Sequence, residues 1–220
     1  MSRPSSRFLS QLAHDLRSPL NVIGSTLTEL SSDTGVLTAA DRQQVLTLSG
    51  RAVSRMIALC DRLSLASRLE QSFELVVVPV DLVQLTRSTL EHFIPGQLRK
   101  RIEVITAFPE APVPVLADVT LLTTLLLELL ANANRFARRI LRVEVSVAET
   151  AVVSIEDDGE GVKEDERTLL FEPFAERRSR TGLGMGLWLA KRLAQLHHGD
   201  LTLAHLVVGT GQELTLPVAK

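Results

Sequence analysis

Residues 121–136 read LLTTLLLELLANANRF and contain the longest apolar stretch of the chain. Glu128 and Asn132 interrupt this stretch, which is well short of the roughly 20 residues that a membrane-spanning helix needs. An apolar run of this kind is typical of a helix that packs against one face of a sheet. We therefore expect a largely buried helix over residues 118–137 and no membrane segment.

The sequence around this helix alternates short β-branched runs with helical patterns, which is typical of an α/β domain. The alternation begins after Gln71, so we expect a linker at residues 70–80 and assign residues 73–220 to this domain. Further helices are expected at residues 81–95 and 186–197. The expected strands lie at residues 73–79, 101–108, 141–148, 152–157, 200–205 and 212–217.

The first 72 residues carry two long helical patterns instead. Apolar residues recur every three or four positions over residues 7–30, and Pro19 is expected to bend this helix. Thr38, followed by Asp41, is typical of the N-cap of a second helix that runs to about Leu69. The two helices form an antiparallel hairpin whose apolar stripe is too large to be covered within it. We therefore expect a homodimer with a four-helix bundle.

Charge and cysteine content exclude several classes of function. The formal net charge is −2 with both signs interspersed, so no basic field attracts nucleic acid and we expect no nucleic-acid partner. Cys60 is the only cysteine, which excludes an internal disulfide or a thiolate cluster, and we expect it to be a small buried residue. The chain opens without a signal peptide, so we expect a cytoplasmic protein.

His14 lies in the first helix at a position that projects from its flank toward water. A neutral imidazole has one nucleophilic nitrogen and is a good phosphoryl acceptor, and the carboxylate of Asp15 can orient the proton on the other nitrogen. Taken alone, His14 is more simply interpreted as a surface histidine. The remaining motifs favour the acceptor.

Glu128 and Asn132 are four residues apart and therefore share one face of their helix. Their oxygen atoms suit Mg²⁺, which keeps waters and nucleotide phosphates as its other ligands. Arg135 adds a cation nearby. The alternative is a solvated polar stripe, but the residues around Asn132 are mostly leucine and alanine.

Asp157, Gly159 and Gly161 form an Asp-x-Gly-x-Gly motif at the end of an expected strand. Glycines there let a flat ligand approach closely, and the aspartate can accept a hydrogen bond from an amine such as that of adenine. By itself this motif is weak evidence, because any tight turn can use it.

A second glycine motif precedes the helix expected at residues 186–197. Gly182, Gly184 and Gly186 give a glycine-rich entry to a helix N-terminus, which is a ready phosphate site. The motif does not directly follow a strand, so a dinucleotide-binding fold is disfavoured. Residues 175–181 before it are polar and basic, and we expect them to form a lid over the phosphates.

In order, these segments resemble the five boxes of sensor histidine kinases. The H box lies at residues 14–20, the N box at 128–136, the G1 box at 157–161, the F box at 171–174 and the G2 box at 182–187. The resemblance spans nearly the whole chain. It implies an α+β protein in which the helical hairpin is followed by the two-layer α/β sandwich of GHKL ATPases.

The resemblance also implies roles for the matching residues. His14 would attack the γ-phosphorus of ATP, and the phosphoryl group would pass to an aspartate of a response-regulator receiver domain. Ser18 stands where the family often has a residue that orients water for dephosphorylating that partner, which implies a phosphatase activity. By the same resemblance Asn132 would hold Mg²⁺ and Asp157 would recognise the adenine amine. The remaining matches are the adenine-pocket glycines Gly159 and Gly161 and the phosphate-wrapping glycines Gly182, Gly184 and Gly186.

Two departures from the family pattern leave alternatives open. Glu128 replaces the usual asparagine and resembles the ATP-hydrolysing branch of the superfamily, and His198 replaces a usual glycine. One alternative is a non-catalytic histidine phosphotransfer protein with a degenerate ATP domain, and another is a GHKL ATPase module in which the hairpin only dimerises. The early start of the first helix leaves no room for a sensor, so the chain is either the cytosolic part of a longer membrane-bound sensor or takes its signal from a separate partner.

Overall fold

The computed structural model describes residues 6–31, 38–69, 74–98, 101–172, 184–204 and 206–219. Their contacts divide them into two units, an N-terminal one made of residues 6–31 and 38–69 and a second one made of the remaining described residues. Within these ranges, no helix is both long enough and apolar enough to span a membrane.

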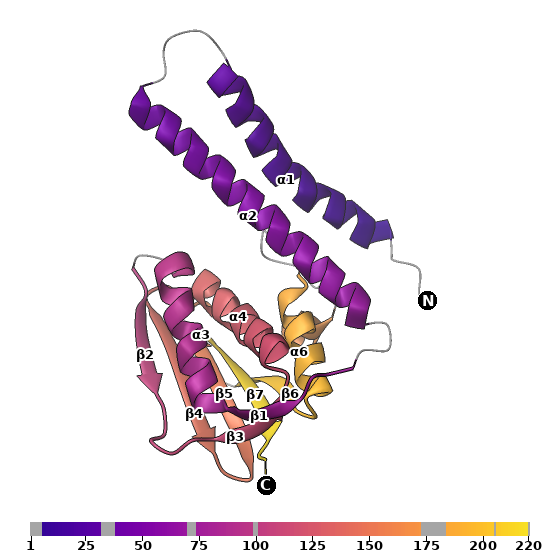
Figure 1. Cartoon of the computed structure of the whole chain (residues 1–220), viewed down its shortest axis with the longest axis vertical. Helices are drawn as coiled ribbons and strands as arrows, with labels where there is room; N and C mark the ends of the chain where they lie inside the picture. Colours follow the sequence, from indigo (N-terminus) through magenta and orange to yellow (C-terminus); the bar gives the residue numbers. More distant parts are fainter. Residues whose placement is uncertain are drawn as a thin grey trace. The chain divides into compact units, whose positions relative to one another are not determined.

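The N-terminal unit is the expected antiparallel hairpin, formed by α1 (Ser6–Ser31) and α2 (Ala39–Leu69) (Figure 1). At the start of α2 the Asp41 N–H donates to Thr38 Oγ1 at 3.2 Å and the Thr38 N–H donates to Asp41 Oδ2 at 3.0 Å, so the predicted N-cap is confirmed. The Thr38 hydroxyl and N–H lower the pKa of Asp41. Helix α1 continues through Pro19 to Ser31.

The hairpin leaves an apolar stripe exposed within one copy of the chain. Val45, Ala52 and Leu59 of α2 are buried, whereas Leu27 of α1 and Ile57 of α2 are 58 % and 56 % exposed. Exposed leucine and isoleucine on both helices are the pattern expected of a face that a second copy covers. Cys60 is also exposed, so the expectation that it is buried was wrong.

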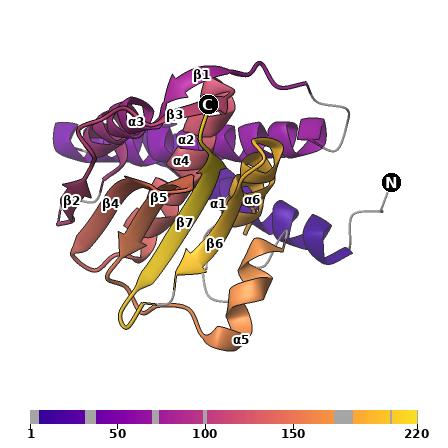
Figure 2. The same cartoon turned by 90° about the horizontal axis from the view of Figure 1, so that it is seen from below.

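The second unit is a two-layer sandwich, as expected. Its five-stranded sheet has the order β2-β4-β5-β7-β6, in which only the β2–β4 pair is parallel. Helices α3, α4 and α6 cover one face of this sheet (Figure 2). The elements are β2 (Glu103–Ala107), β4 (Ile140–Val147), β5 (Thr150–Asp157), β6 (Asp200–Ala204), β7 (Thr210–Pro217), α3 (Leu82–Gln97), α4 (Val119–Phe136) and α6 (Gly186–Leu196).

Three short elements were not expected. β3 (Pro114–Ala117) pairs antiparallel with β1 (Val78–Asp81) in a small second sheet, and α5 (Glu164–Arg167) leads into the 3₁₀ helix η1 (Thr168–Phe171). The strand expected at residues 73–79 was placed too early, because residues 74–77 are not in a strand and Phe73 lies outside the described residues.

A buried histidine joins the two helices that carry the glycine and asparagine motifs. His197 Nδ1 donates to the Leu193 carbonyl at 2.7 Å, and its Nε2 accepts from the Asp118 N–H at 3.1 Å. Asp118 in turn caps α4, since its Oδ1 accepts from the Leu121 N–H at 3.1 Å. This chain of bonds fixes the start of α4 against the end of α6.

The next residue, His198, has a backbone conformation that favours glycine. Its φ is 57°, and it is the one non-glycine residue with positive φ in the part of the chain that the structure describes. This left-handed conformation costs an L-residue roughly 1–2 kcal/mol, whereas glycine adopts it readily.

The apolar stripe predicts the effect of charge on dimerisation. Leu27→Glu or Ile57→Glu would bury an unpaired carboxylate in the dimer, so either should shift the protein to monomers at micromolar concentration in sedimentation velocity. Ala58→Glu is the matched control, because Ala58 is exposed but rotated about 100° around α2 from Ile57. If all three variants remain dimers, the stripe is not the dimer face.

The strained backbone predicts that His198→Gly raises the free energy of unfolding. Relief of strain, partly offset by the greater freedom of glycine in the unfolded chain, should leave a gain of about 0.5–1 kcal/mol in urea unfolding. His92→Gly within α3 should instead lose up to about 0.5 kcal/mol. Equal losses in both variants would contradict the strain.

Candidate functional site

Helix α4 brings both expected Mg²⁺ ligands to one place. It buries eight residues, which fixes its rotation, while Glu128 and Asn132 on a less buried face are partly exposed. A Cβ atom on Gly186, the first residue of α6, would lie only 2.8 Å from Glu128 Oε2. The carboxylate of Glu128 therefore lies against the N-terminus of α6, where negative charge is favoured.

Asn132 is hydrogen-bonded to a residue that the sequence motifs did not identify. Its Nδ2 donates to Gln212 Oε1 at 3.0 Å, and Gln212, on β7, is completely buried. The only sequence signal for Gln212 is an amide side chain on the apolar face of a strand, followed by Leu214 and Leu216. Because Nδ2 is hydrogen-bonded to Gln212, the Oδ1 atom of Asn132 is the one available to a cation.

Asp157 ends β5 as a buried carboxylate, only 4 % exposed. Its Oδ1 accepts from the Gly159 N–H at 2.9 Å, while its buried Oδ2 has no hydrogen-bond partner in the described structure. Burial raises the pKa of Asp157 to about 6. The nearby charge of Asp158 also raises this pKa, whereas the N–H groups of Gly159 and Thr210 lower it. A buried acceptor without a donor fits a ligand amine.

The glycines next to Asp157 are required by close packing. A Cβ on Gly159 would lie 2.6 Å from both Asp157 Oδ1 and the Phe136 carbonyl oxygen. Gly161 has a φ of 74°, and its Cβ would lie 2.9 Å from the Gly209 carbonyl oxygen. Gly209, which the motifs missed, has a φ of 83°. These positions leave no room for side chains beside the carboxylate.

The second glycine motif is only partly within the described residues. Gly184 has a φ of 61°, and Gly186 opens α6 beside Glu128. Gly182, Phe174 and the expected lid at residues 175–181 lie outside the described residues. Arg135 is exposed, with its guanidinium carbon 5.3 Å from the centre of the Phe136 ring.

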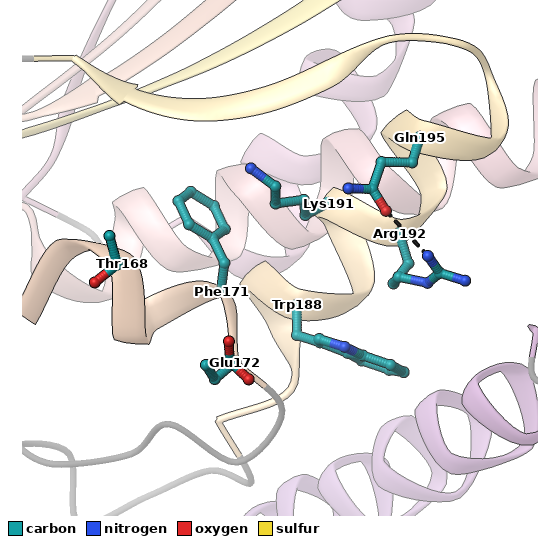
Figure 3. Close-up of a pocket in the computed structure, with 7 residues that line it drawn as sticks. All are labelled: Thr168, Phe171, Glu172, Trp188, Lys191, Arg192 and Gln195. Carbon is teal, nitrogen blue, oxygen red and sulfur yellow. Dashed lines mark hydrogen bonds between the residues drawn. The ribbon is translucent and has the colours of Figure 1, made fainter.

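The first residue of the F box packs onto α6. Lys191 Nζ lies 4.6 Å from the centre of the Phe171 ring and donates to the Leu201 carbonyl at 3.0 Å. Figure 3 shows the adjoining pocket, about 360 Å³ in volume, between η1 and α6. Trp188 and Arg192 line it from α6, and Arg192 Nη1 donates to Gln195 Oε1 at 3.1 Å.

In the hairpin, His14 and Asp15 form a dyad. His14 Nδ1 lies 3.1 Å from Asp15 Oδ1, and the two side chains are 67 % and 10 % exposed. Because a carboxylate only accepts, Nδ1 carries the proton and Nε2 carries the lone pair. Ser18 is exposed one turn further along α1. The hairpin therefore presents a nucleophilic nitrogen to solvent, with its tautomer set by a neighbouring acid.

Two protein-family models match the chain, one on each unit. The His Kinase A (phospho-acceptor) domain matches residues 5–72. The model described as histidine kinase-, DNA gyrase B-, and HSP90-like ATPase matches residues 117–220. The two models follow each other in the order that the sequence motifs predict.

Similar proteins include several sensors. The chain is 29 % identical over 230 residues to the circadian input-output histidine kinase CikA of Synechococcus elongatus, covering 95 % of this chain and 29 % of CikA. It is 29 % identical over 232 residues to the autoinducer 2 sensor kinase/phosphatase LuxQ of Vibrio cholerae, covering 99 % of this chain and 27 % of LuxQ. The chain thus spans less than half the length of these relatives.

Solved structures agree on the architecture. Full-length ShkA in complex with AMPPNP aligns with a TM-score of 0.71 at 28 % identity, over 99 % of this chain and 47 % of ShkA. The histidine kinase AdeS of Acinetobacter baumannii aligns with a TM-score of 0.71 at 18 % identity, over 94 % of this chain and 98 % of that chain, and supports the fold alone. With a phospho-acceptor hairpin followed by this ATPase fold, the chain belongs to the histidine kinases and comprises their catalytic core.

Proposed function

We propose that the chain is an ATP-dependent histidine autokinase of two-component signalling. In this proposal the second unit binds ATP with Mg²⁺, and His14 receives the γ-phosphoryl group. The observation that carries the proposal is the buried Oδ2 of Asp157, an acceptor without a donor at the glycine-bounded end of β5. A degenerate ATP domain would have no use for a buried carboxylate with one oxygen left without a donor, so the non-catalytic phosphotransfer alternative is disfavoured.

The residues of the second unit suit the parts of a magnesium nucleotide. Asp157 Oδ2 would accept from the adenine amine, and Gly159 and Gly161 would let the base approach. Asn132 and Glu128 would hold Mg²⁺, which when bound neutralises charge on the phosphates. Arg135, Gly182, Gly184 and Gly186 complete the proposed nucleotide-binding set. Because Glu128 replaces asparagine, we expect hydrolysis of ATP to compete with phosphoryl transfer to His14.

In the hairpin, His14 would act as the nucleophile. Its Nε2 forms a bond to the γ-phosphorus as the bond between that phosphorus and the bridging oxygen to ADP breaks. The ring becomes cationic in this step, and the Asp15 carboxylate, 3.1 Å from Nδ1, stabilises that charge. Phosphoryl transfer depends mainly on positioning and charge. His14 supplies the attacking nitrogen, and Asp15 supplies the orientation of the ring and the compensating charge.

The proposed partners are a second copy of the chain and a response-regulator receiver domain, whose aspartate would take the phosphoryl group from His14. We also propose a phosphatase activity toward that regulator, with Ser18 orienting water, because Ser18 is exposed one turn from His14. LuxQ, one of the relatives, is described as a kinase/phosphatase. We place the boundary between the hairpin and the ATPase domain at residues 72–73. We also propose that the protein acts in the cytoplasm.

Autophosphorylation can be tested with γ-labelled ATP and Mg²⁺. The wild type should acquire acid-labile, alkali-stable label, His14→Ala should acquire none, and Asn132→Ala should be slowed by at least about 10²-fold. His92→Ala is the matched control, since His92 is an exposed helical histidine of α3 and should label normally.

Two outcomes of this experiment would contradict the proposal. Folded wild-type dimers that acquire no label but accept phosphate from a phosphorylated receiver would be phosphotransfer proteins. ATP turnover that continues unchanged in His14→Ala, with no acid-labile label on the wild type, would indicate an ATPase module.

The raised pKa of Asp157, about 6, predicts a pH-dependent affinity for ATP. Adenine binding needs the carboxylate, so lowering the pH from 7.5 to 5.5 should weaken binding about fourfold through protonation of Asp157. Asp157→Asn supplies one acceptor where Gly159 and adenine need two, so it should bind about tenfold more weakly at pH 7.5. Titration calorimetry across pH separates this effect from protonation of ATP itself, because only the Asp157 component disappears in Asp157→Asn. Parallel profiles for both proteins would exclude Asp157 as the adenine acceptor.

A further inference from the structure

Gln212 places an amide group in an apolar layer. It lies on β7 opposite Ile155 of β5 and Leu203 of β6, on the face that carries Leu214 and Leu216, and it is completely buried. A buried amide is costly unless its donors and acceptor are hydrogen-bonded. Its side-chain hydrogen bonds lead to α4, to the Asn132 side chain and to the Leu129 carbonyl.

These two bonds fix which way each amide faces. The Leu129 carbonyl can only accept, so the Gln212 atom 3.3 Å from it must be the donor Nε2. The other atom of the Gln212 amide is then Oε1, which only accepts. It must therefore face the donor Nδ2 of Asn132, at 3.0 Å. A backbone carbonyl thus sets the direction of the whole chain of bonds.

The consequence falls on Asn132. An isolated asparagine amide can turn by 180°, and only one of the two orientations offers oxygen to a cation. With Nδ2 held by Gln212, Oδ1 is the atom left for a cation. We propose that Gln212 is a positioning residue that orients Asn132 Oδ1 toward Mg²⁺. This inference rests on the proposed function.

The test compares ATP affinity with Mg²⁺ and with excess EDTA. Gln212→Met has similar length but no polar group, so it should lose about tenfold or more of the tightening that Mg²⁺ gives. Its affinity without Mg²⁺ should stay within about twofold, which also reports that the domain is folded. Asn132→Ala should lose at least as much of the Mg²⁺ effect as Gln212→Met, because it removes a proposed ligand.

A matched control and a rescue sharpen the test. Thr215 lies on the same strand, and Thr215→Val removes two hydrogen bonds between the Thr215 hydroxyl and the Asp200 backbone. This variant should keep the full Mg²⁺ effect. Asn132→Asp offers oxygen in both orientations, so adding Gln212→Met to it should change the Mg²⁺ effect less than about twofold. If Gln212→Met does not fold, Gln212→Asn, which is too short to reach both partners, should show the same selective loss.

The outcomes separate this inference from the proposed function. A wild type that does not bind ATP, or binds it without regard to Mg²⁺, would overturn the proposed nucleotide site and this inference with it. A wild type that depends on Mg²⁺, beside a Gln212→Met that keeps that dependence, would overturn the positioning role alone. Equal weakening with and without Mg²⁺ would do the same, since it indicates only a packing role.

Discussion

The second unit depends on one constraint, which is that α4 must serve both as core and as part of the site. Six of its seven leucines are almost fully buried against the sheet and the neighbouring helices, so the helix cannot rotate without losing that packing. The packing of these leucines therefore also fixes the positions of Glu128 and Asn132 on the helix. His197 fixes the N-terminal end through Asp118. Beyond the C-terminal end, the N–H groups of Arg138 and Arg139 donate to Asp158.

Asp157 shows the cost of keeping a binding group inside this packing. Its folded pKa of about 6 lies above the ordinary value of 3.8, so between these pH values the folded state binds more protons than the unfolded one. The free energy of unfolding therefore falls as pH rises through this window, and above about pH 6 the full penalty of the buried charge remains. Asp158, one residue later, receives three backbone hydrogen bonds. The contrast favours a binding role for Asp157 and a structural role for Asp158.

Long periodic elements of this fold were predictable from sequence, and short or tertiary features were not. α1, α2, α4 and α6 were placed to within a few residues because their apolar periodicity extends over several turns. β3 is four residues long and starts at Pro114, so it has neither the length nor the alternation that predicts a strand. Gln212 was missed for a different reason. Its importance comes from a contact with Asn132, 80 positions away, and local sequence carries no trace of such a pairing.

The same chemical problem arises in both units and is met in the same way. An imidazole and a carboxamide each present two similar atoms of which only one can do the required chemistry, and rotation or proton exchange interconverts them. In the hairpin, Asp15 holds the proton on His14 Nδ1 and so leaves the lone pair on Nε2. In the second unit, Gln212 holds Asn132 Nδ2 and so leaves Oδ1. Each selecting residue is more buried than the residue it orients, which keeps water from competing for the bond. The reactive atoms of His14 and Asn132 stay accessible because Asp15 and Gln212 are the more buried members of the two pairs.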